Sequence, residues 1–164
     1  ISIMEEHKIS ELNNLIVELK KLKTNKEETS VEILKGNYVI KNIFKKMMFE
    51  AKPQSEILYF GLDEELMESL EPIYLTRILK HFEKNKIKER IIIKENSKKL
   101  AYAKTAKYRY IPNELLGKTA KIIYQDTIIE FIYTNPIYAI VIKNEQISET
   151  SKKQFEIFWK FAKT

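Results

Sequence analysis

The sequence predicts one α/β domain built on a mixed β-sheet, preceded by an amphipathic helix. Two short apolar runs, Ile57–Phe60 and Ile91–Ile93, flank a helical segment that begins at Pro72. Two buried strands joined by a helix form a βαβ unit, in which the strands are parallel and the crossover is right-handed. Three closely spaced strand-like runs follow between positions 119 and 143, and these predict an antiparallel meander.

Composition fits a single domain. The chain has 164 residues, and its 44% apolar content is enough to fill a core. It has no cysteine, which excludes disulfides and thiolate sites, and no apolar run of the roughly 20 residues that span a membrane. We therefore expect a cytoplasmic protein. Because the chain begins at Ile1 rather than methionine, we also expect it to be part of a longer polypeptide.

The first 27 residues are expected to form a linker and dimerisation helix ahead of a domain at 28–164. Between positions 4 and 23 there is no Gly or Pro, and leucines alternate at steps of three and four, as in a coiled coil. The pattern favours a homodimer, while a helix packed on its own domain remains an alternative. The predicted dimerisation residues are Leu12, Leu15, Leu19 and Leu22.

The next elements are delimited by Gly, Pro and capping residues. A strand at 31–34 ends at Gly36, and a helix from 39 to 48 cannot continue beyond Pro53. Asp63 is placed to cap a brief helix before Pro72 begins the crossover helix.

Between 96 and 112 the pattern is weaker. Positions 100–105 suggest a helical turn, and 108–110 a short strand that stops at Pro112. Strands at 119–124, 128–133 and 138–143 follow, with turns at 125–126 and 134–136.

The chain closes with a helix that is expected to open near Ser148. One of its faces is aromatic and is predicted to be core, through Phe155, Phe158, Trp159 and Ala162.

The segment Thr119–Asp126 has the residue spacing of a catalytic motif. It reads Thr-Ala-Lys-Ile-Ile-Tyr-Gln-Asp, and so resembles the phospholipase D signature H-x-K-x4-D with threonine replacing the histidine. In phospholipase D enzymes that histidine attacks phosphorus and carries the covalent intermediate. A chain without it is expected to bind rather than to catalyse.

The order of elements around this motif is similar to the C-terminal part of archaeal TrmB-family transcriptional regulators. The sharpest points of resemblance are Gly36, the run 59–61, Thr119-Lys121-Asp126 and the Phe155–Trp159 helix. The resemblance implies a phospholipase D-like mixed sheet flanked by helices, a coiled linker helix that dimerises, and a small-molecule effector such as a sugar or phosphorylated metabolite. It also implies DNA binding through a winged-helix domain that this chain does not contain.

The effector groove implied by the motif contains Thr119 and Lys121, with Asp126 orienting them. Strand alternation places Lys121 on the same side as Ile123, where it needs a partner or water. A lysine on the exposed face of an edge strand is an equal alternative.

The other candidate effector contacts are selected only by their position in the predicted fold. Gly61 ends a central strand, where α/β sheets usually bind ligands, with Tyr59 beside it. Asn135 and Arg77 are possible polar contacts, although each fits a surface or turn residue equally well.

No cofactor or metal is expected, because His7 and His81 are distant in sequence and no Gly-rich phosphate loop is present. Two alternatives remain open: a phospholipase D-type phosphodiesterase or nuclease with a divergent nucleophile, and direct nucleic-acid binding. The second rests on region 77–109, which holds twelve Lys and Arg against three Glu.

Overall fold

The computed structural model describes the backbone of residues 2–24 and 28–164, and the side chains of residues 2–20 and 28–164. The helices are α1 (Ile3–Thr24), α2 (Val39–Glu50), α3 (Glu64–Leu70), α4 (Pro72–Lys84) and α5 (Glu145–Phe161), with a short 3-10 turn at Asn113–Leu115. The strands are β1 (Ser30–Lys35), β2 (Glu56–Phe60), β3 (Lys88–Lys94), β4 (Ala106–Ile111), β5 (Thr119–Tyr124), β6 (Thr127–Ile132) and β7 (Tyr138–Lys143).

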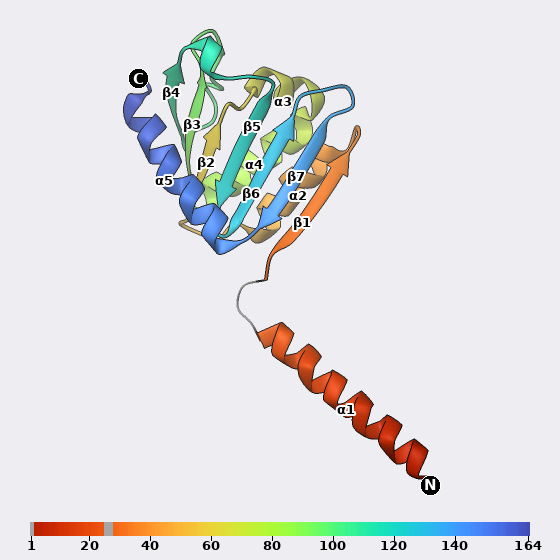
Figure 1. The fold of residues 1–164 in the computed structure, drawn as a ribbon. Coiled ribbons are helices and arrows are strands. Elements are labelled where there is room, and N and C mark those ends of the chain that lie inside the picture. Colours follow the sequence, from red (N-terminus) through yellow and green to blue (C-terminus); the bar gives the residue numbers. More distant parts are fainter. Residues whose placement is uncertain (1, 25–27) are drawn as a thin grey trace.

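All seven strands form one sheet in the order β1-β7-β6-β5-β2-β3-β4 (Figure 1). Strands β2, β3 and β4 are parallel to one another, as the βαβ pattern predicts, and β5, β6, β7 and β1 form an antiparallel meander. The two halves join where β2 pairs antiparallel with β5. The predicted mixed α/β sheet is therefore confirmed.

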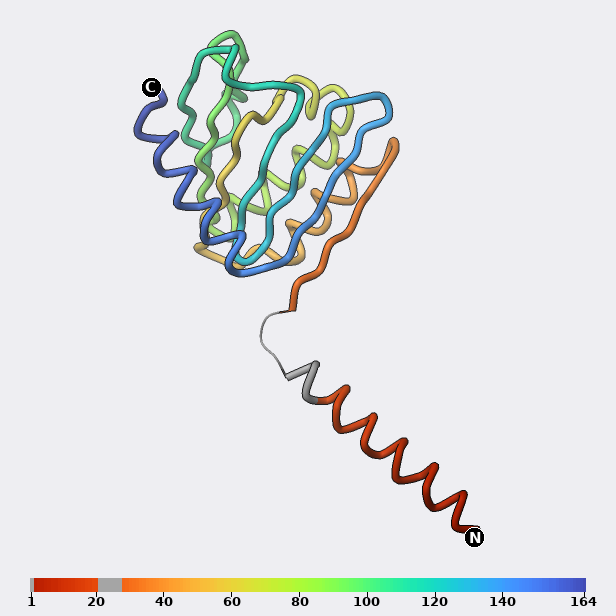
Figure 2. The backbone as a smooth tube through the Cα atoms, in the orientation of Figure 1, coloured from red at the N-terminus to blue at the C-terminus, as the bar shows by residue number. Residues whose placement is uncertain are grey.

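The sheet separates two hydrophobic layers. Helices α2, α3 and α4 cover one face and α5 crosses the other, as the backbone trace also shows (Figure 2). The larger core lies under α2 and α4 and includes Ile43, Met47 and Phe82, each at most 1% exposed. The smaller core lies under α5, around Phe155.

Local signals place most element ends. The Asp63 side chain accepts a hydrogen bond from the Leu66 amide at 3.0 Å and so caps α3, as expected. Pro72 occupies the first turn of α4, where its missing N–H leaves no donor unsatisfied.

Three local expectations were wrong. Helix α5 begins three residues before Ser148, because the Asn144 side chain caps it by accepting from the Ile147 amide at 3.0 Å. Phe158 is 39% exposed at the rim of the core. Positions 100–105 form turns rather than helix, and β4 follows them directly.

Helix α1 stands apart from the sheet (Figure 1). Leu12, Leu15 and Leu19 are 57%, 52% and 50% exposed, so its apolar stripe is open in this structure. The side chain of Leu22, the fourth predicted dimerisation residue, lies outside the described residues. No helix in the described part of the chain has the length and apolar content needed to cross a membrane.

Gly61 lies at the seam between the two halves of the sheet. Its φ is +82°, and a Cβ built on it would stand 2.9 Å from the carbonyl oxygen of Thr119. Its amide donates to the Ile92 carbonyl oxygen at 2.8 Å. Only glycine satisfies both the left-handed φ and the close approach.

We predict that Gly61→Ala lowers the free energy of unfolding by about 2 kcal/mol or more, because it combines backbone strain with a backbone clash. Denaturant unfolding measures the loss. Gly117→Ala is the matched control, since Gly117 has no positive φ and nothing within 4 Å of a built Cβ. Equal stability of the two variants would contradict the role given to Gly61.

Candidate functional site

The lysine of the degenerate motif lies on the face of the sheet that α5 partly covers. Lys121 lines a cavity of about 70 Å³ beside Ser151 and Phe158 of α5. In the β5–β6 register Lys121 is opposite Glu130, and its Nζ lies 3.2 Å from Glu130 Oε1. Both side chains are 32% exposed, so the lysine has a partner on an interior strand rather than a place on an edge strand.

The motif residues do not converge. Thr119 is exposed at the first position of β5, whereas Asp126 follows the end of that strand in the β5–β6 turn. At about 3.3 Å per residue, a strand of this length separates them by roughly 20 Å. Asp126 lines a separate, open cavity of about 680 Å³ in which both signs of charge are present.

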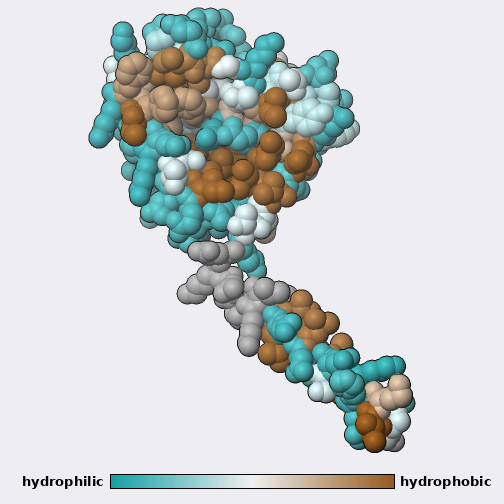
Figure 3. Space-filling view, viewed as in Figure 1, coloured by the Kyte–Doolittle hydropathy of each residue, from teal (hydrophilic) through white to brown (hydrophobic). Residues whose placement is uncertain are grey.

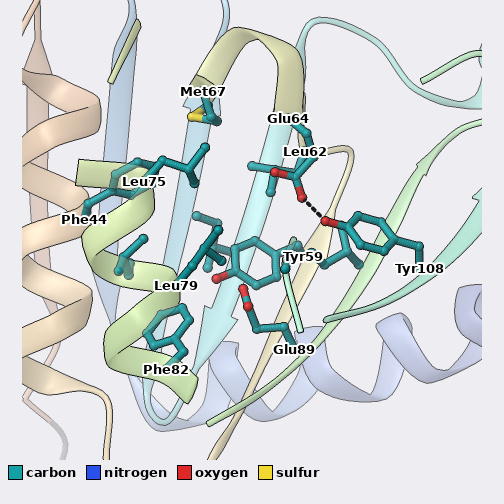
Figure 4. A pocket seen from close by; sticks show the side chains of 14 residues that line it. Phe44, Tyr59, Leu62, Glu64, Met67, Leu75, Leu79, Phe82, Glu89 and Tyr108 are labelled. Carbon is teal, nitrogen blue, oxygen red and sulfur yellow. Dashed lines mark hydrogen bonds between the residues drawn. The ribbon is translucent and has the colours of Figure 1, made fainter. Parts of the chain in front are cut away.

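Tyr59 is directed into the opposite layer. It is 5% exposed and lines a small cavity of about 30 Å³ between the sheet and α4, enough for roughly two water molecules (Figure 4). Figure 4 shows its ring beside Glu89, with Glu64 facing Tyr108. The structure therefore does not bring Tyr59 together with Thr119 or Lys121.

Two buried carboxyl groups belong to this cavity, and both are paired with hydroxyls rather than cations. Glu64 accepts from Tyr108 Oη at 2.7 Å, and Glu89 accepts from Thr105 Oγ1 at 3.0 Å. Burial raises the pKa of Glu64 to about 7, with the hydrogen bond from Tyr108 opposing the shift. Burial also raises the pKa of Glu89, and burial together with Glu89 raises the pKa of Tyr59.

Gly61 does line a groove. The cavity has a volume of about 280 Å³ and lies at the edge of the sheet where β2, β3 and β6 end and β5 begins. This is the edge at which α/β sheets usually bind ligands. Its lining residues are Gly61, Leu62, Asp63, Leu66, Lys94, Ser97, Gly117, Lys118 and Tyr133.

Of the other predicted contacts, Asn135 is exposed in the β6–β7 loop and is not among the residues that line the groove. Besides Asp63, the polar lining comes from Lys94, Ser97, Lys118 and Tyr133, none of which was predicted as a contact. Lys94 and Ser97 follow the apolar run 91–93, so the strand-end rule that selected Gly61 could have selected them as well.

The basic region 77–109 does not form one continuous patch. Arg90 pairs with Glu56 at 2.8 Å and Glu156 at 2.5 Å, and Lys104 pairs with Glu83 at 3.4 Å. Arg109 lies over the Trp159 ring, 4.4 Å from its centroid.

Arg77 belongs to a cluster on the outer surface of α2 and α4. It lies 5.1 Å from the centroid of the Tyr74 ring, with Lys41 at 4.9 Å and Lys45 at 5.4 Å. Direct nucleic-acid binding stays a prediction for these residues.

The arrangement of elements defines the class. A parallel βαβ half joined to an antiparallel meander, with α5 on the second face, is a phospholipase D-like fold. The Nuc protein of Salmonella typhimurium, a phospholipase D family member, matches 83% of this chain and 97% of its own at 14% identity and a TM-score of 0.58. NucT from Helicobacter pylori matches 82% of this chain and 98% of its own at 10% identity, with a TM-score of 0.59.

A third solved structure, that of TrmBL2, an archaeal chromatin protein with a novel mode of DNA binding, is similar over nearly the whole chain. The match covers 98% of this chain at 18% identity, with a TM-score of 0.57. The chain spans 64% of the length of TrmBL2. The predicted resemblance to TrmB-type proteins is thus confirmed at the level of the fold. No protein-family model and no curated protein sequence matches the chain.

We predict that Glu64 makes the protein less stable as pH rises. Its folded pKa, about 7, is above the ordinary 4.5, so between these values the unfolded chain releases the proton first and the free energy of unfolding falls. The loss of unfolding free energy, on the order of 3 kcal/mol, is complete above pH 7 and absent below pH 4.5.

Glu64→Gln keeps an acceptor for Tyr108 without an ionisable proton. Denaturant unfolding at pH 5 and pH 8 should therefore give a smaller difference for this variant than for the wild type. Glu65→Gln, on the exposed side of the same helix, serves as the control. An unchanged pH dependence in Glu64→Gln would contradict the assignment.

Proposed function

We propose that this chain is the non-catalytic, effector-sensing and dimerising domain of a TrmB-like transcriptional regulator that acts in the cytoplasm. The observation that carries the proposal is the state of the phosphodiesterase motif. Threonine stands at position 119, and Lys121 is paired with Glu130 at 3.2 Å.

The chemistry of these groups supports binding rather than turnover. A threonine hydroxyl becomes a nucleophile only when a neighbouring base removes its proton. Next to Thr119 on the same face of β5 is Lys121, an acid whose charge is balanced by Glu130. Asp126 is at the far end of the strand. The three groups therefore cannot act together on one phosphorus atom.

Helix α1 supports the dimerisation part. Its exposed leucines repeat at coiled-coil spacing, and burying such a stripe against a second copy removes apolar area from water. Figure 3 shows apolar side chains along α1 and a second apolar area on the sheet. Val31 and Ile33 of the edge strand β1 are also exposed, at 62% and 67%.

The proposed mechanism is a shift between two arrangements of the dimer. α1 leads into β1, so a change in the domain can alter how two α1 helices meet. An effector causes such a change only through unequal affinity for the two arrangements. We assign DNA binding to a winged-helix domain outside this chain, as the resemblance to TrmB-family regulators implies. TrmBL2, of which the chain spans 64%, is a DNA-binding protein.

We predict no hydrolysis of a chromogenic phosphodiester and no trapped phospho-protein, because the groups for covalent catalysis are not assembled. A phospholipase D enzyme with an intact histidine motif is the positive control. Turnover by the wild type that disappears in Lys121→Ala would overturn the non-catalytic assignment.

We also predict a dimer in solution that depends on α1. The double variant Leu12→Glu with Leu19→Glu should change the mass measured by light scattering from dimer to monomer, because buried carboxylates oppose helix pairing. The matched control is Ser10→Glu with Asn14→Glu, which adds the same charge on the opposite side of the helix. Dimers in both variants, or monomers in the wild type at high concentration, would contradict the role of α1.

A further inference from the structure

The groove at the carboxyl ends of β2 and β3 contains two lysines that are not engaged by acids. Among the side chains that the structure describes, neither Lys94 nor Lys118 forms an ion pair with a carboxylate. Both line the same cavity of about 280 Å³. Asp63 is the only carboxylate in that lining, and it already caps α3, so the positive charge in the groove exceeds the negative.

Two neutral hydroxyl groups complete the lining. The Tyr133 hydroxyl oxygen accepts from the Asp63 amide at 3.2 Å, which leaves its own proton available to another acceptor. Burial raises the pKa of Tyr133, so this proton is held throughout the physiological range. Ser97 adds a second hydroxyl from the end of β3. Ammonium and hydroxyl donors are the groups that bind oxyanions in proteins.

The walls of the groove are fixed by main-chain contacts. The Tyr133 amide donates to the Lys118 carbonyl oxygen at 2.8 Å, and Gly61 lies against the Thr119 carbonyl. Donors held in place before binding lose little freedom when a ligand arrives. The groove lies at the edge of the sheet beside α3, whereas the Lys121 side chain lies in a separate cavity beside α5.

We propose that this groove is the effector site, and that its ligand is a small hydroxylated metabolite with a phosphate ester group. Lys94 and Lys118 bind the phosphate oxygens, Tyr133 and Ser97 donate to them, and Asp63 accepts from a ligand hydroxyl. This inference rests on the proposed regulatory function, because it names the ligand class and the position of the effector. The volume suits a small metabolite rather than a polymer.

Isothermal titration with glucose 6-phosphate, inorganic phosphate and glucose, at one ionic strength set with chloride, tests the proposal. We expect glucose 6-phosphate to bind saturably, inorganic phosphate more weakly, and glucose not at all. The double variant Lys94→Gln with Lys118→Gln should weaken binding of glucose 6-phosphate at least tenfold. The control, Lys107→Gln with Lys153→Gln, changes net charge equally at exposed positions outside the groove and should bind like the wild type.

Three results would overturn the proposal: no saturable binding of either phosphate compound, equal weakening in both double variants, or full affinity in Lys94→Gln with Lys118→Gln. Circular dichroism and thermal unfolding confirm that each variant is folded. These outcomes are separate from the tests of the regulatory function, because mass in solution and phosphodiester turnover do not depend on the groove. A dimeric, inactive protein that ignores phosphate would reject the ligand class alone.

Discussion

The antiparallel pairing of β2 with β5 is the constraint on which the rest of the structure depends. It is the one junction between the parallel half of the sheet and the antiparallel meander. At the end of β2 the junction requires glycine at position 61, because the main chain of Gly61 lies against the carbonyl oxygen of Thr119. The same approach brings the end of β2 next to the start of β5, and the groove with Lys94 and Lys118 opens at that point.

Lys121 and the groove with Lys94 and Lys118 lie in different parts of the sheet. On the α5 side, Lys121 forms an ion pair with Glu130. At the edge of the sheet, the ends of β2 and β3 and the start of β5 border the groove that contains Lys94 and Lys118. A phospholipase D-like fold does not by itself imply phosphodiester chemistry, since fold and function are separable.

The helices and strands were predicted well from the sequence, because the residues that begin and end them act on the backbone nearby. Pro72, Asp63 and Gly36 mark element ends through their own backbone chemistry, and the 119–143 strands are close enough to pair as neighbours. The order of the sheet was not predictable, because the β2–β5 pairing joins residues about sixty positions apart. The site was only partly predicted for the same reason: the linear motif grouped Thr119 with Asp126, which the strand holds apart, and missed Lys118 and Tyr133, which the pairing of β5 with β6 brings together.

Strand β1 is bonded on one side only, to β7, and it receives the chain from α1. Edge strands of this kind invite addition of another strand, and the charged Glu32 and Lys35 oppose that on β1. The attachment also has a mechanical meaning. We expect a force applied along α1 to act first on the pairing of β1 with β7, which holds six residues of β1. The expected mechanical weak point of the chain is thus the edge strand that follows α1.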